Sequence, residues 1–251
     1  MAEGPEPAWQ ARTLLRGARA AVLATADREG APHAALVTPA WAPELSGLLW
    51  LSRLSAHTSH LAAEPRCALF VQGPAVGANP QTAPRVSLAG RAAPVEDEAL
   101  KARWLAIHPY AALYAGFTDF ALWRVVPSHA QLVGGFGRAF RLPAAELGPD
   151  PATAAAFAAA EATLIAAAEA QHASLLQALG TAAAKSTGQD IPGRDIVGPW
   201  RLVALDSDGI DLATPTASLR LHWPAPLAHP EAVAAAWDQL AGGLDGAGKL
   251  A

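Results

Sequence analysis

The stretch 50–72, WLSRLSAHTSHLAAEPRCALFVQ, decides the fold of this chain. Apolar strand signals cover residues 48–51 and 67–71, and between them lie hydroxyl and cationic side chains that lead into a short helical piece. Hydroxyls and backbone N–H groups at a helix N-terminus favour an anion, and arginine or histidine adds positive charge. The stretch therefore has two interpretations. It is either a phosphate-binding turn or an ordinary helix between two strands, capped by Thr58 or Ser59.

Short strand signals recur on both sides of this stretch. They cover residues 21–25, 32–38, 85–92, 121–126 and 130–133, after an amphipathic helix at 8–18. One helix is inserted at 97–108, and no strand–helix–strand repeat with long crossovers occurs. This order predicts a small antiparallel β-barrel rather than a doubly wound parallel sheet.

A composition shift at residues 147–151 marks a domain boundary. The elements expected after it are an alanine-rich helix at about 152–179, strands at 201–205, 210–212 and 218–223, and a closing helix at 230–240. The turn DSDG at 206–209 joins two of these strands and lacks the later glutamate that a calcium loop requires. The sequence therefore predicts two domains, 1–148 and 149–251, the second with the order αβββα.

Composition excludes several classes of function. The chain has 251 residues, of which 52% are hydrophobic and 16% charged, so it can bury a substantial core. The net charge is −4 and no run of Lys or Arg occurs, which argues against nucleic acid or an anionic membrane as partner. A single cysteine, Cys67, excludes an intramolecular disulfide framework and fits a reducing compartment. No signal peptide or transmembrane helix is predicted, and we expect a cytoplasmic protein.

Other motifs in the chain are weaker. Residues 134–138, GGFGR, lack the third glycine and the later acidic residue of a dinucleotide-binding fingerprint. They indicate either a bulged strand end or an exposed passage in which Arg138 is available to an anion or an interface. His57, His60 and Glu64 have helical spacing, but the helix is short and no fourth ligand follows, so no metal site is predicted. No serine nucleophile elbow occurs, and no side chain stands out as an obligatory acid or base.

Seven phrases of the front half occur in one order between residues 8 and 142. They are ARTLLR (11–16), AT with GAP (24–25, 30–32), LSRLSAHTSHL with EPR (51–61, 64–66), PRVSLAGRA (84–92), RWLAIHP (103–109), DF (119–120) and VGGFGRA (133–139). Together they resemble the FMN-binding split barrel of the pyridoxamine 5′-phosphate oxidase-like superfamily, and most of all its HugZ-type haem-utilisation branch. The back half is similar to the small C-terminal domain of that branch, through His172 and LDSDGIDL at 205–212. The resemblance implies a six-stranded antiparallel split β-barrel followed by a small α/β domain.

The resemblance also implies FMN at the two-fold interface of a homodimer, with the phosphate held by the segment after the third strand. Carried over by position, the cofactor-binding candidates are Ser52, Arg53, Ser55, His57, Thr58, Arg85 and Arg138. Three positions depart from the oxidase pattern: His57 replaces a lysine, Ala35 a phosphate-binding arginine, and Arg85 a flavin-contacting glutamine. These departures argue against pyridoxal phosphate synthesis and imply weaker binding of FMN.

In the haem-using branch, a histidine of the C-terminal region ligates the iron, and His172 matches it. The residues before it here are Glu169, Ala170 and Gln171, so the acidic residue next to the histidine, which would orient its ring, is missing. Arg138 is the candidate for a distal polar group beside the iron.

Three functions follow, in this order. The first is a homodimeric FMN-dependent oxidoreductase acting on a small-molecule substrate, with the chemistry carried by the cofactor. The second is a haem-binding or haem-degrading protein with His172 as axial ligand. The third is a dimer that binds a flavin or tetrapyrrole without turnover.

Overall fold

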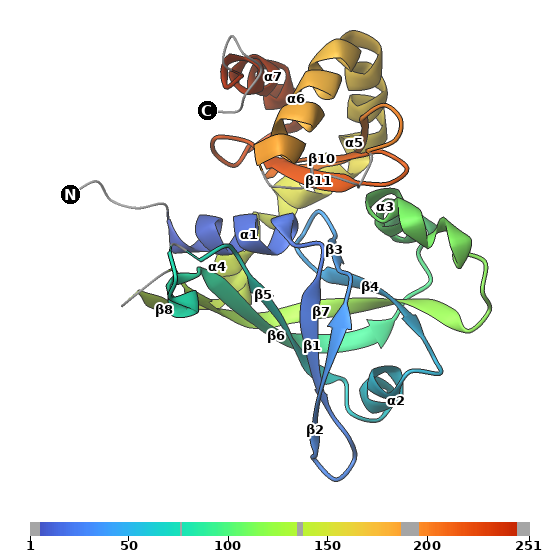
Figure 1. The fold of residues 1–251 in the computed structure, drawn as a ribbon. Coiled ribbons are helices and arrows are strands. Elements are labelled where there is room, and N and C mark those ends of the chain that lie inside the picture. The colour runs from blue at the N-terminus through green and yellow to red at the C-terminus, as the bar shows by residue number, and fades with distance from the viewer. Residues whose placement is uncertain (1–5, 76, 135–137, 187–195, 245–251) are drawn as a thin grey trace. The chain divides into compact units, whose positions relative to one another are not determined.

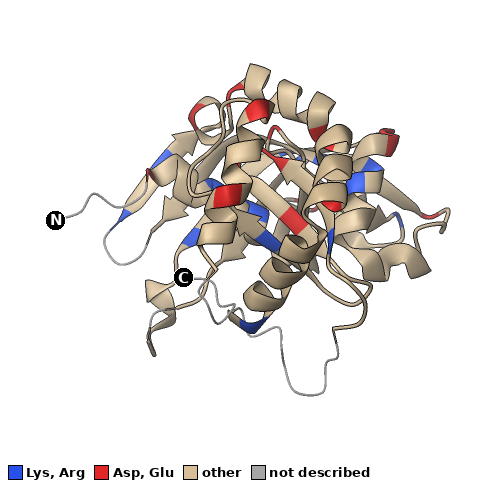
Figure 2. Cartoon of the chain, turned by 90° about the horizontal axis from the view of Figure 1, so that it is seen from above, with Lys and Arg blue, Asp and Glu red and all other residues tan. Residues whose placement is uncertain are grey.

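The chain folds into two compact units, which are described separately. The computed structural model describes residues 6–75, 77–134, 138–186 and 196–244 (Figure 1). The first unit contains residues 1–104 and 116–149, and the second contains residues 105–115 and 150–251. Lysine and arginine are spread over several elements among the acidic residues rather than gathered on one helix or strand (Figure 2).

The first unit is built on one antiparallel sheet in the order β2-β1-β5-β6-β7-β4-β3, with β8 paired to β7. Its strands are β1 (Ala21–Ala26), β2 (Pro32–Val37), β3 (Ala40–Trp41), β4 (Gly47–Ser52), β5 (Arg66–Gln72), β6 (Arg85–Pro94), β7 (Phe120–Val133) and β8 (Ala139–Pro143). Its helical segments are α1 (Pro7–Gly17), α2 (Ala56–Ala63), the three-residue η1 (Pro80–Thr82), α3 (Glu98–Ile107) and α4 (Ala144–Leu147); α3 runs into the second unit. The sheet curls into a half-barrel, and the prediction of an antiparallel split barrel is confirmed (Figure 1).

The described sheet has eight strands, whereas the resemblance implied six and the sequence signals marked seven segments; two of those segments are one strand, and β3 and β8 were not predicted. The additional strand β3 has only two residues, too few to show an alternating pattern. The two strands expected at 121–126 and 130–133 are one continuous strand, β7, which contains Pro127. Proline fits there because the register between β6 and β7 shifts at this point, opposite Gly90.

Period-two alternation divides the strands into an inward and an outward face. Leu23, Leu69, Leu88 and Leu132 point inward and are fully buried, and Leu15 of α1 packs into the same core. This inward face forms the core of the half-barrel.

The outward face of the sheet carries an unusual row of side chains. In register across four strands lie Leu36, Val22, Phe70 and Ser87. The next row on this face contains only alanines, at positions 34, 24, 68 and 89. Leu36 is 76% exposed and Val22 is 38% exposed. This part of the face is therefore mostly apolar and open.

The second unit packs helices around a three-stranded sheet in the order β11-β10-β9. Its elements are η2 (Pro109–Leu113), α5 (Pro151–Gln171), α6 (Ala173–Ser186), β9 (Arg201–Asp206), β10 (Gly209–Ala213), β11 (Ser218–His222), η3 (Pro230–Ala232) and α7 (Val233–Gly242). The prediction of a single long helix at 152–179 is wrong, because α5 ends at Gln171, with His172 as its C-cap residue, and α6 begins at Ala173. No glycine or proline marks this break, and the His172 ring instead stacks on Trp237 of α7.

Helix α5 is long and apolar enough, by length and composition, to cross a membrane. This is weak evidence for a membrane-spanning helix, because two glutamates of α5 bind the backbone of β9. The Glu161 and Glu169 carboxylates accept hydrogen bonds from the backbone N–H groups of Leu205 and Leu202, at 2.8 and 2.7 Å. Eight residues of helix rise about 12 Å and three residues of strand about 10 Å, so the two spacings match. The glutamates therefore hold α5 along the edge strand β9.

A buried charge network joins β9, β10 and β11. Arg220 donates to both carboxylate oxygens of Asp206, at 2.5 and 3.1 Å, and to Asp211 at 2.7 Å. The side chains of these three residues are at most 4% exposed. The turn predicted at 206–209 is present, but it is part of the interior rather than a solvated hairpin tip.

His222 makes the second unit sensitive to acid. Burial and the nearby Arg220 charge lower the pKa of His222 to about 4, against the opposing carboxylates of Asp206, Asp211 and Asp208. The unfolded chain takes up this proton near pH 6.5 and the folded chain only near pH 4, so stability falls as the pH drops through that window. The loss in the free energy of unfolding is roughly 3 kcal/mol.

We expect the His222→Gln variant to lack this acid-dependent loss of stability when urea unfolding is compared at pH 7, 5.5 and 4. Parallel pH profiles for the two proteins would contradict the assignment.

Candidate functional site

The turn after β4 is closed by an acidic residue. The Ser52 hydroxyl donates to Asp119 Oδ2 at 2.5 Å, and the Arg53 backbone N–H donates to the Asp119 carbonyl at 2.8 Å. The Leu54 N–H donates in turn to Ser52 Oγ at 3.2 Å. The hydroxyl proton of Ser52 is therefore already used, and a carboxylate stands beside it, which is unfavourable for a phosphate.

The remaining candidates of this turn lie on or beside α2. Ser55 is the N-cap residue of α2, but its side chain makes no capping hydrogen bond. Arg53 is exposed. Thr58 is only 5% exposed, and its Oγ1 has no hydrogen-bond partner among the described residues. The structure thus gathers Ser52, Arg53, Ser55 and Thr58 around one helix N-terminus, with Thr58 as a buried donor that a ligand could use.

Three histidines meet beside this helix, which the sequence did not reveal. The rings of His33 on β2 and His60 on α2 lie edge to face with centroids 5.2 Å apart, and His60 Nδ1 lies 3.2 Å from Thr25 Oγ1. Burial, then His33 and His60, lower the pKa of His57. His57 is therefore a poorer cation at neutral pH than the lysine it replaces.

The two other candidates of the first unit, Arg85 and Arg138, lie far from the turn after β4 within one chain. Ser52 pairs with Phe120 at one end of β7, whereas Arg85 pairs with Val133 at the other end. These ends are separated by 14 residues of strand, roughly 40 Å of strand length. The Arg85 guanidinium donates to loop carbonyls at 3.0 and 3.1 Å. The predicted cofactor-binding residues are therefore two groups rather than one site in a single chain.

Arg138 belongs to the second group. Its guanidinium lies 5.8 Å from the ring centroid of Phe140, and its carbonyl accepts the N–H of Gly134 at 2.9 Å. Residues 135–137 of the predicted glycine passage lie outside the described residues. Arg138 is exposed, so its charge is available to a ligand or a partner.

His172 of the second unit ends α5 and is half-buried. Its ring stacks on Trp237 with centroids 5.2 Å apart and an angle of 30° between the ring planes. Neither ring nitrogen hydrogen-bonds to a described residue. Glu169 does not orient this ring, because its carboxylate binds Arg201 and the N–H of Leu202, both at 2.7 Å. A histidine with unengaged nitrogens on a rigid aromatic support is suited to ligate a metal centre brought by a cofactor.

Protein side chains alone do not assemble a metal site in the described part of the chain. No group of three or more His, Cys, Asp or Glu side chains there is placed to hold a metal ion. The three histidines beside α2 are included in that statement.

Comparison with known proteins identifies relatives of both the barrel and the whole chain. The family model for pyridoxamine 5′-phosphate oxidase matches residues 9–134. A protein of Arabidopsis thaliana described as "Non-canonical heme oxygenase HOZ, chloroplastic" is 32% identical over 139 residues, which cover 53% of this chain and 42% of that protein. The match therefore spans less than half of the relative.

Two solved structures resemble the chain over almost its full length. The protein Atu2129 of Agrobacterium tumefaciens str. C58, of unknown function, has a TM-score of 0.71 at 24% identity and covers 94% of this chain and 95% of that one. A heme binding protein of Mycobacterium smegmatis has a TM-score of 0.54 at 28% identity, with 96% and 98% covered. The first of these likenesses shows the fold alone.

Proposed function

The chain belongs to the pyridoxamine 5′-phosphate oxidase family, and from this premise we propose that it is a haem-binding protein with His172 as the axial ligand of the iron. The family resemblance predicted from the sequence motifs is confirmed. Two relatives at or above 28% identity are described as a heme oxygenase and a heme binding protein, which supports the choice of haem.

The observation that carries the proposal is the environment of His172. Its imidazole is held by Trp237 rather than by a hydrogen bond, so no described residue occupies either nitrogen and one of them can ligate the iron. Trp237 is itself buried and packs edge to face on Trp223, with ring centroids 5.6 Å apart. The residues present thus fit an iron porphyrin in one respect, a preorganised imidazole nitrogen donor. Haem, when bound, would supply the iron redox chemistry, and the protein would supply the ligand and exclude water.

FMN is the second candidate, and the buried Thr58 hydroxyl favours it. A phosphate at the N-terminus of α2 would satisfy Thr58 Oγ1. Three features weigh against FMN at that place: the Asp119 carboxylate, the lowered pKa of His57, and the alanine at position 35. The residues present therefore fit haem better than the flavin phosphate.

Parallel titrations test the choice of cofactor. The full-length protein is mixed with haemin, followed by the Soret absorption, and separately with FMN, followed by flavin fluorescence. We expect a saturable shift of the Soret band at one haemin per chain and little change in flavin fluorescence. Stoichiometric quenching of FMN without a Soret shift would instead support the flavin function. If haemin binds, a reductant is then added in air. Loss of the Soret band would identify haem degradation, and persistence of the band would identify a protein that binds haem without degrading it.

We further propose that the protein is a homodimer that pairs through the outward face of the sheet. The apolar row of Leu36, Val22 and Phe70 and the alanine row beside it form an open apolar surface. A surface of this kind on a sheet is typical of an interface between copies. Pairing would also bring a second copy of each candidate group, which matters because the two groups lie at opposite ends of β7.

Replacing Leu36 by glutamate should convert the dimer into a monomer. The substitution buries a carboxylate in the proposed apolar interface, which costs several kcal/mol. Sedimentation velocity should give about twice 25.8 kDa for the wild type and 25.8 kDa for Leu36→Glu. Leu113→Glu is the matched control, since Leu113 is 85% exposed and lies in the second unit. A monomeric wild type, or a dimer that tolerates Leu36→Glu, would contradict this interface.

A further inference from the structure

Three histidines of the first unit lie where α2 packs against the β1–β2 hairpin (Figure 1). They are His33 on β2 and His57 and His60 on α2, and they are called the histidine cluster below. His33 stands opposite Thr25 in the register of β1 and β2, and Thr25 shares its face of β1 with the buried Leu23. The cluster is therefore on the inward side of the sheet.

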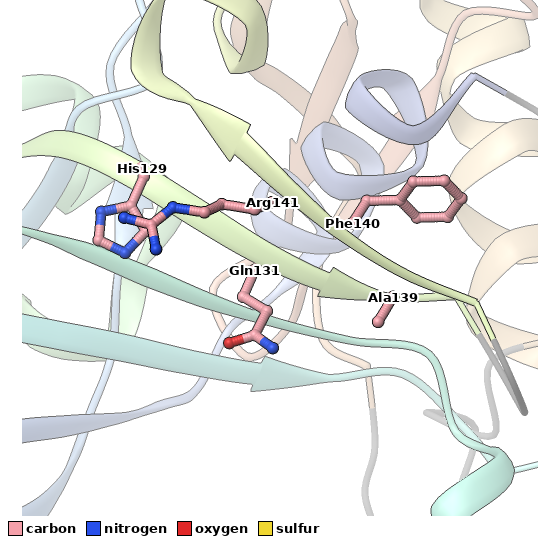
Figure 3. Close-up of a pocket in the computed structure, with 5 residues that line it drawn as sticks. All are labelled: His129, Gln131, Ala139, Phe140 and Arg141. Atoms are coloured by element: carbon pink, nitrogen blue, oxygen red, sulfur yellow. The ribbon is translucent and has the colours of Figure 1, made fainter.

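The outward side carries the pocket that Figure 3 shows, and the two features are separate. The pocket is lined by His129, Gln131, Ala139, Phe140 and Arg141. Gln131 pairs with Ser87 on one side and with Arg141 on the other, so the pocket continues the rows of the proposed interface between copies. The histidine cluster does not belong to these rows, because it is on the opposite face of the sheet.

The rings of the histidine cluster share one half-buried space. Those of His33 and His60 lie edge to face with their centroids 5.2 Å apart. Thr25 Oγ1 lies 3.2 Å from His60 Nδ1, and this contact joins α2 to β1. Burial comes first among the causes that lower the pKa of His57, and the charges of His33 and His60 follow. Each ring of the cluster is therefore close enough to another to affect its protonation.

Within the described residues, no carboxylate is placed to balance positive charge on these rings. The strands that pack against α2 carry three titratable side chains: His33, Arg85 and Arg91. The acidic residues at the ends of these elements are engaged elsewhere. Glu64 is bound by Arg66 at 2.8 and 2.9 Å, Asp27 accepts N–H groups of its own turn, and Asp119 accepts the hydroxyl of Ser52. Protonation therefore places like charges together without a counterion.

The packed cluster can hold one charged ring but not two. The face of one imidazole attracts a cation at its edge-to-face neighbour, so a single charge is tolerated. A second charge at the 5.2 Å separation of His33 and His60 is repelled, and burial strengthens the repulsion. If α2 separates from the hairpin, water solvates all three rings, and each takes up a proton at about pH 6.5. Acid therefore favours the separated form, because that form binds more protons.

We propose that the histidine cluster is a pH-sensitive latch, which holds α2 against the β1–β2 hairpin at neutral pH and releases it at mildly acidic pH. Helix α2 begins directly after the turn that follows β4, and it carries the buried Thr58. Release of the helix would therefore also take apart the group of candidates at its N-terminus. The latch is independent of the proposed haem function, because His172 and Trp237 belong to the second unit.

Hydrogen exchange of α2 tests the latch. Protection factors are measured by mass spectrometry at pH 7.5 and 5.0 on the full-length wild type and on His222→Gln, which lacks the acid-sensitive group of the second unit. We expect α2 to lose at least about tenfold in protection at pH 5.0 in both proteins, because the released form binds additional protons. In His222→Gln, α5 should lose less than about twofold, since no part of the latch lies in the second unit. A pH-independent α2, or an equal loss in α2 and α5 of His222→Gln, would contradict the proposal.

Variants of the cluster identify the groups that respond to acid. His33→Gln and His60→Gln each replace a ring by a neutral amide, and the double variant leaves one histidine in the cluster. The double variant should keep the protection of α2 within about twofold between the two pH values, since one charge is tolerated. His229→Gln, which removes an exposed histidine of the second unit, should show the wild-type loss. An undiminished loss in the double variant would overturn the proposal.

The charge of each ring gives a check that needs no variant. In the wild type labelled with ¹⁵N at histidine, long-range ¹H–¹⁵N NMR reports which rings of the cluster carry a second proton. We expect no more than one charged ring in the cluster as long as α2 remains protected. Two charged rings beside a protected α2 would also overturn the proposal.

Discussion

The His172→Ala variant is expected to lose at least about tenfold in affinity for haemin and to lose the histidine-ligated Soret band. The imidazole is the only group of the second unit that we assign to the iron, so no neighbouring side chain is expected to compensate. The effect is measured by titrating haemin into both proteins at neutral pH and fitting the Soret absorption.

Because His172 stacks on Trp237, a second variant is needed to separate loss of the ligand from a folding defect. Alanine removes a ring that packs against a buried tryptophan, so a folding defect could imitate a loss of ligand. His172→Phe keeps an aromatic ring on Trp237 and removes both nitrogens, and we expect it to fold normally and to bind haemin as weakly as His172→Ala. His229→Ala, which removes an exposed histidine of the same unit, should bind like the wild type. Wild-type affinity in His172→Phe would exclude His172 as the ligand.

The Arg220→Met variant is expected to destabilise the protein by roughly 3–5 kcal/mol, a larger loss of stability than we expect from any other single substitution. The guanidinium donates hydrogen bonds to Asp206 and Asp211. Its removal leaves these two carboxylates in the interior without the positive charge of Arg220. The methionine fills similar volume, so most of the loss is electrostatic rather than a cavity. Urea unfolding followed by tryptophan fluorescence measures the change, since Trp223 donates its indole N–H to the Asp206 carbonyl at 3.0 Å.

An exposed ion pair of the same unit provides the contrast. Arg201 binds Glu169 at 2.7 Å, but its side chain is 66% exposed. Solvent screens this pair, and Arg201→Ala should cost less than about 1 kcal/mol. If Arg220→Met and Arg201→Ala lost equal free energy of unfolding, burial would not govern the contribution of the Arg220 network to stability.

The sequence predicted the strands of the barrel because their alternation of apolar and polar residues is local information. It divided β7 into two, since proline normally interrupts a strand and the bulge that accommodates Pro127 depends on Gly90 of another strand. The break between α5 and α6 was missed for a similar reason. No residue near His172 stops a helix, and its ring contacts Trp237, 65 residues later in the chain.

The candidate site was predicted as a set of residues but not as an arrangement. Asp119 was part of a motif, yet its bond to Ser52 joins residues 67 positions apart and no spacing reveals it. The histidine cluster could be anticipated only in part, because the hairpin places His33 opposite Thr25 while His60 reaches them from α2. The Arg220 network did leave a signal. The alternation of residues 218–223 puts Arg220 on the face away from Leu219 and Leu221, and Asp211 lies on the neighbouring strand.

The iron–ligand bond itself tests the central claim most directly. Resonance Raman spectra of the reduced haem complex, prepared with and without ¹⁵N-histidine, report whether a histidine nitrogen binds the iron. The account predicts an iron–histidine stretching band that shifts on labelling, is absent in His172→Phe and persists in His229→Ala. A spectrum without an isotope-sensitive band, or the same band in His172→Phe, would contradict the assignment of His172 as the axial ligand.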